Sequence, residues 1–242
     1  MITVNSEENN SSNAVVQHTV SGFPRLGVNI AAIPDVLKPL KWAVWRAEPR
    51  EGQPGKFAKR PRHANGNAIS VNKLEQWLTF EEACQAYQTG EFSGIGVLLN
   101  GSVVGLDVDD FAQAREQHPK LAALLERAGS EGIYCEQSPS GNGYRLFVHG
   151  DLLMAADKRA GCLEIYKEKR FLTVTGQGQG EVKAAQWLID DYVALMAERK
   201  GKTPQEQEVS DVTATTNAAV TAETQPQLSC DELAAKVDTI AE

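Results

Sequence analysis

The sequence of 242 residues has no apolar run long enough to cross a lipid bilayer. Its longest apolar runs, residues 95–99 and 103–106, have the length of strands, whereas a membrane-spanning helix needs about 20 residues. The N-terminus lacks the basic start and the apolar segment of a secretory signal. These absences predict a cytoplasmic protein with no membrane partner.

Cysteine is scarce and scattered. The four cysteines are Cys84, Cys135, Cys162 and Cys230, and no two of them form a CxxC pair. This spacing argues against a zinc ribbon and against a disulfide framework. Buried thiols that pack as small hydrophobic groups are the expected state.

Basic residues are fewer than acidic residues, but most of the excess negative charge lies in one part of the chain. The chain carries a net charge of -8, of which residues 201–242 contribute -6 through eight acids and two bases. Residues 38–62 hold eight bases and two acids, a local charge of +6. An acidic tail beside a basic segment is compatible with a nucleic-acid partner.

Composition divides the chain into three parts. Residues 1–23 are unpatterned and rich in Asn and Ser, which predicts a flexible lead. Residues 24–200 carry the apolar patterning of a folded domain. Residues 201–242 are rich in Thr, Ala, Gln and Glu, and predict a disordered acidic linker or tail with a short helix over 230–241.

The pattern between the ends mixes strands and helices. A strand is expected at 42–46 and a loop over the Gly- and Pro-rich stretch 49–67. Thr79 and Glu82 form the signature of a capping box, so a helix should begin there and end at Gly90. The Asn100-Gly101 dipeptide predicts a tight turn that joins strands 94–99 and 102–108 in a hairpin.

The later elements complete an α+β pattern. The sequence predicts a helical region over 111–128 that is broken near Pro119, and a final helix over 184–199. Strands are expected at 133–137, 144–149, 163–166 and 171–175. The order β-β-α-β-β with added strands predicts an RRM-like antiparallel sheet backed by helices, with an N-terminal α/β extension.

Two aspartates are the first candidates for catalysis. Side chains alternate along a strand, so Asp107 and Asp109 should share one face while Leu106 and Val108 pack in the core. Neighbouring carboxylates repel unless a cation lies between them, and a hard divalent ion such as Mg²⁺ or Mn²⁺ suits oxygen ligands. Alone, the motif is better explained by a strand end that caps the next helix, with Asp110 as the cap.

The turn that follows the expected strand 133–137 is rich in small residues, which are Ser138, Ser140, Gly141 and Gly143. Its backbone N–H groups could cradle phosphate oxygens, or it could be a plain hairpin turn. Arg145 follows on the next strand, and its guanidinium fork suits a triphosphate.

Glu164 is expected in a strand on the face opposite Leu163 and Ile165. A buried carboxylate requires a partner, and either a metal ion or a salt bridge to Arg159 or Arg170 would supply one. We favour the metal because the aspartate pair is also present.

Together these segments resemble the bifunctional primase-polymerase domain of the archaeo-eukaryotic primase superfamily, which occurs in phage and plasmid replication proteins. The resemblance spans about residues 33–176. It depends on the order and spacing of several motifs: Trp42 to Arg46, Lys59 to Pro61, Asp107 with Asp109, Ser138 to Gly143, Glu164 to Tyr166, and Arg170 to Gly176.

The resemblance implies a DNA primase or DNA polymerase that joins nucleoside triphosphates on a single-stranded DNA template, with Asp107, Asp109 and Glu164 as catalytic metal ligands. Arg170 and the turn residues would then bind nucleotide. Arg145 stands where the family has a phosphate-binding histidine, and His149 is ~13 Å further along the strand. Family members often carry a replicative helicase, so a fused or separate helicase is an expected partner.

Four cations in the basic segment, Lys56, Lys59, Arg60 and Arg62, are expected to grip the template backbone; otherwise they form a solvated surface. Two other functions remain open. One is a two-metal nuclease, which would need a Lys or His near the metals as general base. The other is a catalytically weak DNA-binding protein of replication initiation.

Overall fold

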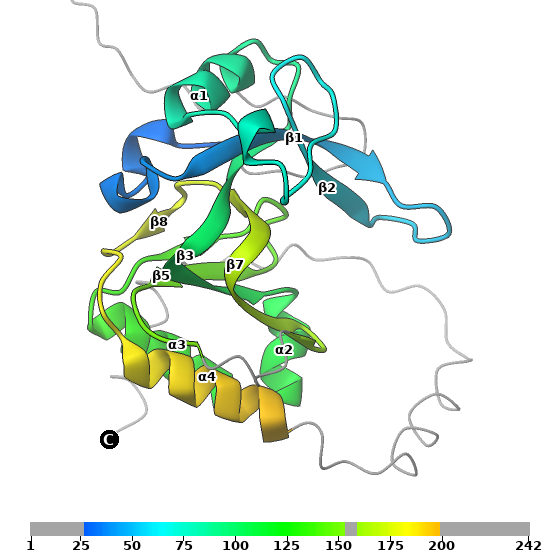
Figure 1. Ribbon diagram of the computed structural model, residues 1–242. Coiled ribbons are helices and arrows are strands. Elements are labelled where there is room, and N and C mark those ends of the chain that lie inside the picture. Colours follow the sequence, from blue (N-terminus) through cyan, green and yellow to red (C-terminus); the bar gives the residue numbers. More distant parts are fainter. Residues whose placement is uncertain (1–26, 153–158, 199–242) are drawn as a thin grey trace, which may run out of the picture.

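The fold is a mixed α and β architecture, as expected from the sequence. The computed structural model describes residues 27–152 and 159–198, so the predicted lead and tail lie outside it. In these ranges eight strands form one sheet with antiparallel ladders (Figure 1). The strands are β1 (Lys41–Pro49), β2 (Phe57–Arg62), β3 (Gly94–Val108), β4 (Cys135–Gln137), β5 (Tyr144–Val148), β6 (Arg159–Ala160), β7 (Leu163–Val174) and β8 (Gly178–Gln179).

Four α-helices accompany the sheet in the same ranges: α1 (Phe80–Gln88), α2 (Phe111–Gln117), α3 (Leu121–Ser130) and α4 (Gln186–Glu198). The predicted capping box is confirmed, because Thr79 accepts from the Glu82 backbone and Glu82 accepts from the Thr79 backbone. The predicted break near Pro119 separates α2 from α3. None of these described helices has the length and hydrophobicity to cross a membrane.

The predicted hairpin over residues 94–108 is wrong, because these residues form one strand, β3, whose two halves pair with β7 and not with each other. Gly101 has a φ of 99°, which serves an irregularity in the strand and not a two-residue turn. The ladder with β7 shifts register on both sides of Asn100 and resumes where Gly105 faces Tyr166. Hydrogen bonds to β7 on both halves of β3 therefore outweigh the local turn preference.

Two further expectations need correction. The stretch 49–67 is not a simple loop, since it contains β2, which pairs with β1 in antiparallel register. The strands expected at 163–166 and 171–175 are one strand, β7. Cys84 and Cys135 are buried as predicted, whereas Cys162 is half-buried and donates to Gln113; Cys230 lies outside the described residues.

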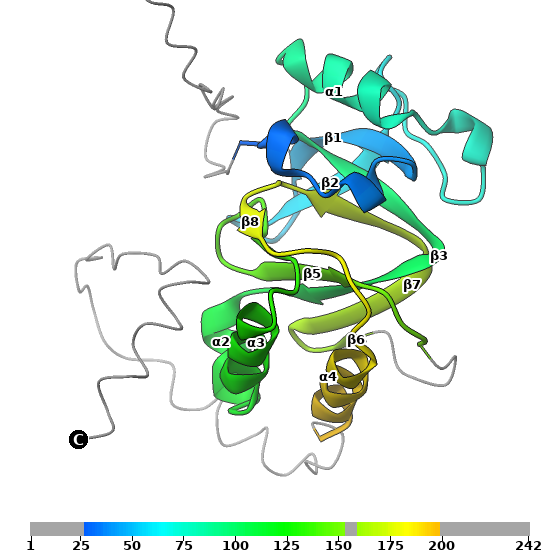
Figure 2. The ribbon, with the colours of Figure 1, turned by 90° about the vertical axis from the view of Figure 1, so that its left-hand side faces the viewer.

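The two halves of β3 contribute to two different hydrophobic cores. Ile95 and Val97 pack into the core beneath α1, whereas Leu106 and Val108 pack into the core formed with α2, α3 and α4. Figures 1 and 2 both show α1 at one end of the molecule and the other three helices at the opposite end. The strand alternates, so Asp107 points away from α2, α3 and α4. The side chains facing this way in the second half of β3 form the candidate site.

Candidate functional site

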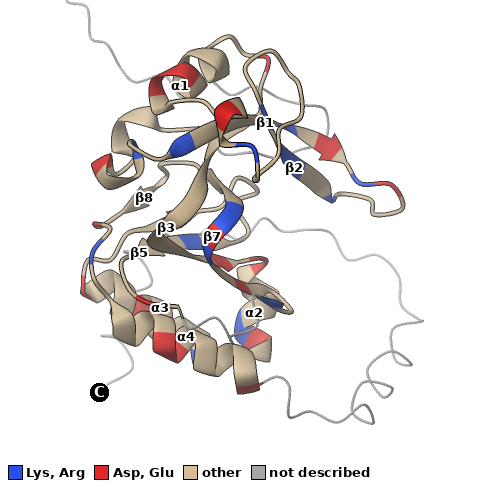
Figure 3. Cartoon of the chain, in the orientation of Figure 1, with Lys and Arg blue, Asp and Glu red and all other residues tan. Residues whose placement is uncertain are grey.

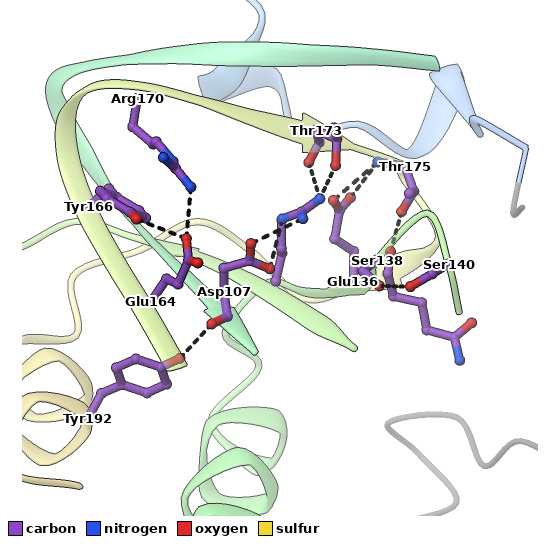
Figure 4. A network of polar contacts seen from close by, with 12 residues as sticks. Asp107, Glu136, Ser138, Ser140, Glu164, Tyr166, Arg170, Thr173, Thr175 and Tyr192 are labelled. Atoms are coloured by element: carbon purple, nitrogen blue, oxygen red, sulfur yellow. Dashed lines mark hydrogen bonds and ion pairs between the residues drawn. The ribbon is translucent and has the colours of Figure 1, made fainter. Parts of the chain in front are cut away.

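A row of charged residues crosses the sheet at the level of Asp107. Backbone pairing places Glu136 of β4 opposite Arg145 of β5, and Arg145 opposite Asp107 of β3. The pairing also places Asp107 opposite Glu164 of β7, and Glu164 opposite Arg159 of β6. Directly paired residues share a face of the sheet, so these five side chains form one line, which we call the charged row. Figure 4 shows three of its members, Glu136, Asp107 and Glu164.

Asp107 and Arg145 form a buried ion pair at the centre of the row. Arg145 Nε lies 3.1 Å from Asp107 Oδ1, and Arg145 Nη2 donates to Asp107 Oδ2 at 3.2 Å. Arg145 Nη1 also donates to the backbone oxygen of Thr173 at 2.8 Å and to its hydroxyl. Burial opposes the charge of Arg145, but Asp107 and then Glu136 outweigh this effect and raise its pKa. The guanidinium is thus engaged inside the protein, where it holds the Asp107 carboxylate in place.

Glu164 is held by two arginines. Its Oε2 accepts from the Tyr166 hydroxyl and from Arg170 Nη2, each at 2.8 Å, and its Oε1 lies 3.2 Å from Arg159 Nε. The carboxylate is buried while both arginine side chains are partly exposed. The salt-bridge alternative for this residue therefore describes the observed contacts, without need of a metal.

Asp109 follows the end of β3 and is half-buried. Burial raises the pKa of its carboxyl, and the charges of Asp107 and Glu164 add to the effect, against the opposing charge of Arg145. The next residue, Asp110, caps α2 by accepting from the Gln113 backbone, as expected. The ionised form of Asp109 is therefore disfavoured in the site, and a bound cation would stabilise it.

The donor set fits a divalent cation at two of the three predicted ligands. Asp107 Oδ1 is buried and accepts no hydrogen bond despite its closeness to Arg145 Nε, so it retains a lone pair for a ligand. Asp107 and Asp109 thus suit Mg²⁺ or Mn²⁺. Glu164 fits less well, because its two oxygens are held by two arginines and by Tyr166, whereas a single arginine contacts Asp107. Accordingly, no group of three His, Cys, Asp or Glu side chains in the described residues is arranged to hold a metal.

The aspartates lie in a cleft of about 570 Å³ that has basic walls. Its acidic residues are Asp107, Asp109, Asp110 and Glu164. Its basic residues are Arg50, Lys56, Lys59, Arg145, Arg159 and Arg170. Figure 3 shows Lys and Arg on both β2 and β7 above the acidic end of β3. A cleft with carboxylates in its floor and cations around them suits a polyanion bound together with a divalent metal.

Lys59 was expected to bind the template, and the structure places it beside the aspartates. Burial, followed by the charge of Arg145, lowers its pKa to about 8, while Asp107 and Asp109 act in the opposite direction. Its approach to the site was not foreseen, because residues 49–67 were expected to be a loop. β2 carries the lysine to this position.

The other predicted template residues are divided. Lys56 lines the cleft with the aspartates, whereas Arg60 lines a neighbouring cleft. Arg62 forms an ion pair with Glu48 and donates to the Gly66 backbone. It is therefore engaged with its own hairpin, and lines neither cleft.

The small-residue turn joins β4 to β5 next to the aspartates. The backbone N–H groups of Ser138 and Gly141 donate within the turn, to Gly143 and Ser138, and the two serine hydroxyls lie 3.1 Å apart. A Cβ on Gly143 would lie 2.1 Å from the Val108 backbone oxygen, so this glycine permits close contact with β3. Ser140 and Asn142 line the cleft. The turn is close enough to meet a ligand there, although two of its donors are already used.

Glu136 is a site residue that sequence reasoning missed. It is fully buried, and accepts from the Tyr134 hydroxyl and from the backbone N–H groups of Thr175 and Gly176. Burial raises its pKa against the opposing effects of Arg145 and these donors. An acidic residue between Cys135 and Gln137 in an expected strand was the available signal.

The comparisons with known proteins add no assignment to this site. The chain matches no protein-family model, and no curated protein matches it significantly. The function therefore has to be argued from the residues themselves.

Proposed function

We propose that the chain catalyses template-directed nucleotidyl transfer on single-stranded DNA, as a primase or polymerase of phage or plasmid replication. One observation carries the proposal: Asp107 and Asp109 lie in the floor of a cleft whose walls are basic. Nucleotidyl transfer brings triphosphate, template and divalent metal to one place, and this distribution of charge suits all three. The antiparallel sheet with helices is compatible with the RRM-like, primase-like fold that we propose for it.

Each residue of the cleft would have its own role. Asp107 and Asp109 would hold Mg²⁺ or Mn²⁺, which stabilises charge on the attacking and leaving oxygens when bound. Arg145 keeps Asp107 in position, Arg170 and Arg159 offer charge to phosphate oxygens at the cleft wall, and Glu164 orients these two arginines. Ser140 and Asn142 approach the nucleotide from the adjoining turn.

A nucleotide-incorporation assay tests the proposal. Primed and unprimed single-stranded templates are incubated with ribo- or deoxynucleoside triphosphates and Mg²⁺ or Mn²⁺, and products are resolved by length. We expect extension or priming by the parent and none by Asp109→Asn. The matched control is Asp110→Asn, which changes the neighbouring helix cap and not the proposed metal site. No incorporation under any of these conditions would contradict the proposal.

A two-metal nuclease is a second candidate, and the position of Lys59 favours it. A lysine with a pKa near 8 beside two aspartates is partly neutral near neutral pH, so it has the properties of a general base. Metal-dependent degradation of the labelled template without incorporation would identify this activity, and Lys59→Met should then abolish it.

A DNA-binding protein without strong catalysis is the third candidate. It is favoured by the contacts of Glu164, which is bound by arginines and leaves two carboxylates for metal. Metal-independent binding of single strands, with neither incorporation nor degradation, would support this alternative.

A further inference from the structure

A second cleft adjoins the one that holds the aspartates. It has a volume of about 890 Å³ and lies between the end of β1, the start of β2 and the irregular part of β7. Four residues line both clefts: Arg50, Lys59, Arg170 and Phe171. Because they share these four residues, the two clefts adjoin, and we refer to both together as the groove.

The second cleft is lined by more basic than acidic residues. Its basic residues are Arg50, Lys59, Arg60, Lys169 and Arg170, against two acids, Glu48 and Glu51. Glu48 is neutralised by its ion pair with Arg62. In the described ranges, no carboxylate forms an ion pair with Arg50, Arg60 or Lys169. Three cations without acidic partners therefore face the same groove, as expected for a surface that binds a polyanion.

Lys169 reaches the groove through a bulge in β7. Leu99 faces Arg170 and Asn100 faces Glu168, so Lys169 is an extra residue on the β7 side of the ladder. Its φ of 52° lies in the left-handed region, which costs a residue with a side chain about 1 kcal/mol. Such a bulge redirects a side chain at the edge of a site. Here the redirected side chain is an exposed lysine in the groove wall.

Phe171 provides an aromatic surface at the junction of the two clefts. Its ring packs over Gly96, where a Cβ would lie 2.6 Å from the ring, and its centroid is 5.9 Å from that of Trp77. Both neighbours restrict the motion of the ring, and the residue is half-buried. An aromatic ring that lines a cleft together with several cations offers a surface on which an unpaired base can stack.

We propose that a single strand of DNA lies along this groove, with phosphates against Arg50, Arg60 and Lys169 and one base stacked on Phe171. The strand then reaches the aspartates at the far end of the groove. Its identity as the template rests on the proposed function, whereas the binding itself does not. Duplex DNA is a poorer occupant, because its bases are already stacked on one another and cannot cover the ring.

The cationic part of the proposal is tested by the salt dependence of binding. Fluorescein-labelled oligo-dT is titrated with the protein by anisotropy at several NaCl concentrations, without metal or nucleoside triphosphate. The double variant Arg50→Ala/Lys169→Ala removes two phosphate contacts, so the slope of log affinity against log salt should become shallower by about 1.4. The control is Lys41→Ala/Arg115→Ala, which removes two exposed cations that line neither cleft. An unchanged slope in the groove variant, or an equal change in the control, would overturn the proposal.

The stacking part is tested with Phe171→Leu and Phe171→Tyr. Leucine keeps an apolar side chain but lacks a flat ring, so affinity for oligo-dT should fall about tenfold, as for the loss of one stacked base. Tyrosine should retain the parent affinity. Equal affinity of the leucine variant and the parent, or tighter binding of duplex than of single strand, would refute the assignment. Because no catalysis is required, a failure of incorporation leaves these measurements interpretable, and a failure here leaves the incorporation assay unaffected.

Discussion

Asp107 and Arg145 lie directly opposite each other on β3 and β5, and both side chains of this ion pair are buried. The pairing changes what the aspartates are expected to do for stability. If Asp107 and Asp109 only repelled each other, removing both would stabilise the protein without metal. Removing Asp107, however, also leaves a buried guanidinium without its counter-charge, and this loss is the larger effect.

The first prediction concerns this pair. Asp107→Ala should lower the free energy of unfolding by about 3 to 5 kcal/mol, because a buried charge loses its partner. Arg145→Met should also lower the free energy of unfolding, because it leaves the buried Asp107 carboxylate without its counter-charge. The double variant should be more stable than the sum of the two losses predicts, as measured by urea unfolding. Additive losses would show that the two side chains do not interact across the sheet.

Replacing Asp109, unlike replacing Asp107, should stabilise the folded protein. Its pKa is raised by burial and by the charge of Asp107, so the folded state holds a proton there more tightly than the unfolded chain. Its ionised form therefore destabilises the protein at neutral pH, and the effect disappears as the pH falls below the unfolded value. Asp109→Asn should raise the Tm at neutral pH by a few degrees, for about 1 kcal/mol, and by less in acid. A lower Tm at neutral pH would contradict this account.

Arg145 can be tested for phosphate binding separately from carboxylate positioning. Its contacts to Asp107 and Thr173 predict that Arg145→Met weakens Mn²⁺ binding and leaves nucleotide affinity at saturating Mn²⁺ near that of the parent. Metal and nucleotide are titrated separately against the variant. A selective loss of nucleotide affinity would instead support the phosphate fork predicted from the sequence.

Lys59 should make binding in the cleft depend on pH. With a pKa near 8 it is a cation below that pH, so affinity for oligo-dT should weaken as the pH rises through 8. The same lowered pKa means that the unfolded chain binds this proton more tightly, so charging Lys59 costs stability. Lys59→Met should thus raise the Tm near pH 7, and the gain should shrink toward about pH 10. Parallel pH profiles for variant and parent would contradict the assigned shift.

The acidic tail should be dispensable. Residues 201–242 carry a charge of -6, and their composition predicts no core. Truncation after Lys200 should leave the Tm unchanged and should strengthen oligo-dT binding at low salt, because a repelling charge is removed. Loss of the folded state in the truncated chain would show that the domain extends beyond residue 200.

Alternation along strands made part of the site predictable. Asp107 and Glu164 were placed opposite their apolar neighbours, and the structure has both on the same face, as adjacent members of the charged row. The Thr79 cap and the break near Pro119 could also be predicted from the sequence, because both depend on contacts within a few residues.

Long-range pairing accounts for what was missed. Asn100-Gly101 has the local chemistry of a hairpin turn, but β7 pairs with both halves of β3 and keeps the strand continuous. Glu136 and Lys59 reach the site only through the register of β4 with β5 and of β2 with β1. No short stretch of sequence specifies those registers, so neither residue could be placed beside Asp107 and Arg145 in advance.

Continuity of β3 and β7 has a consequence for how the molecule opens. Each strand contributes to both hydrophobic cores, so neither core can separate without breaking the ladder that runs through the other. Amide hydrogens in the two halves of β3 should therefore exchange with solvent through one shared opening of high free energy. The chain could not be divided at Asn100 into two pieces that fold alone. The aspartates would then remain in place until the whole domain unfolds.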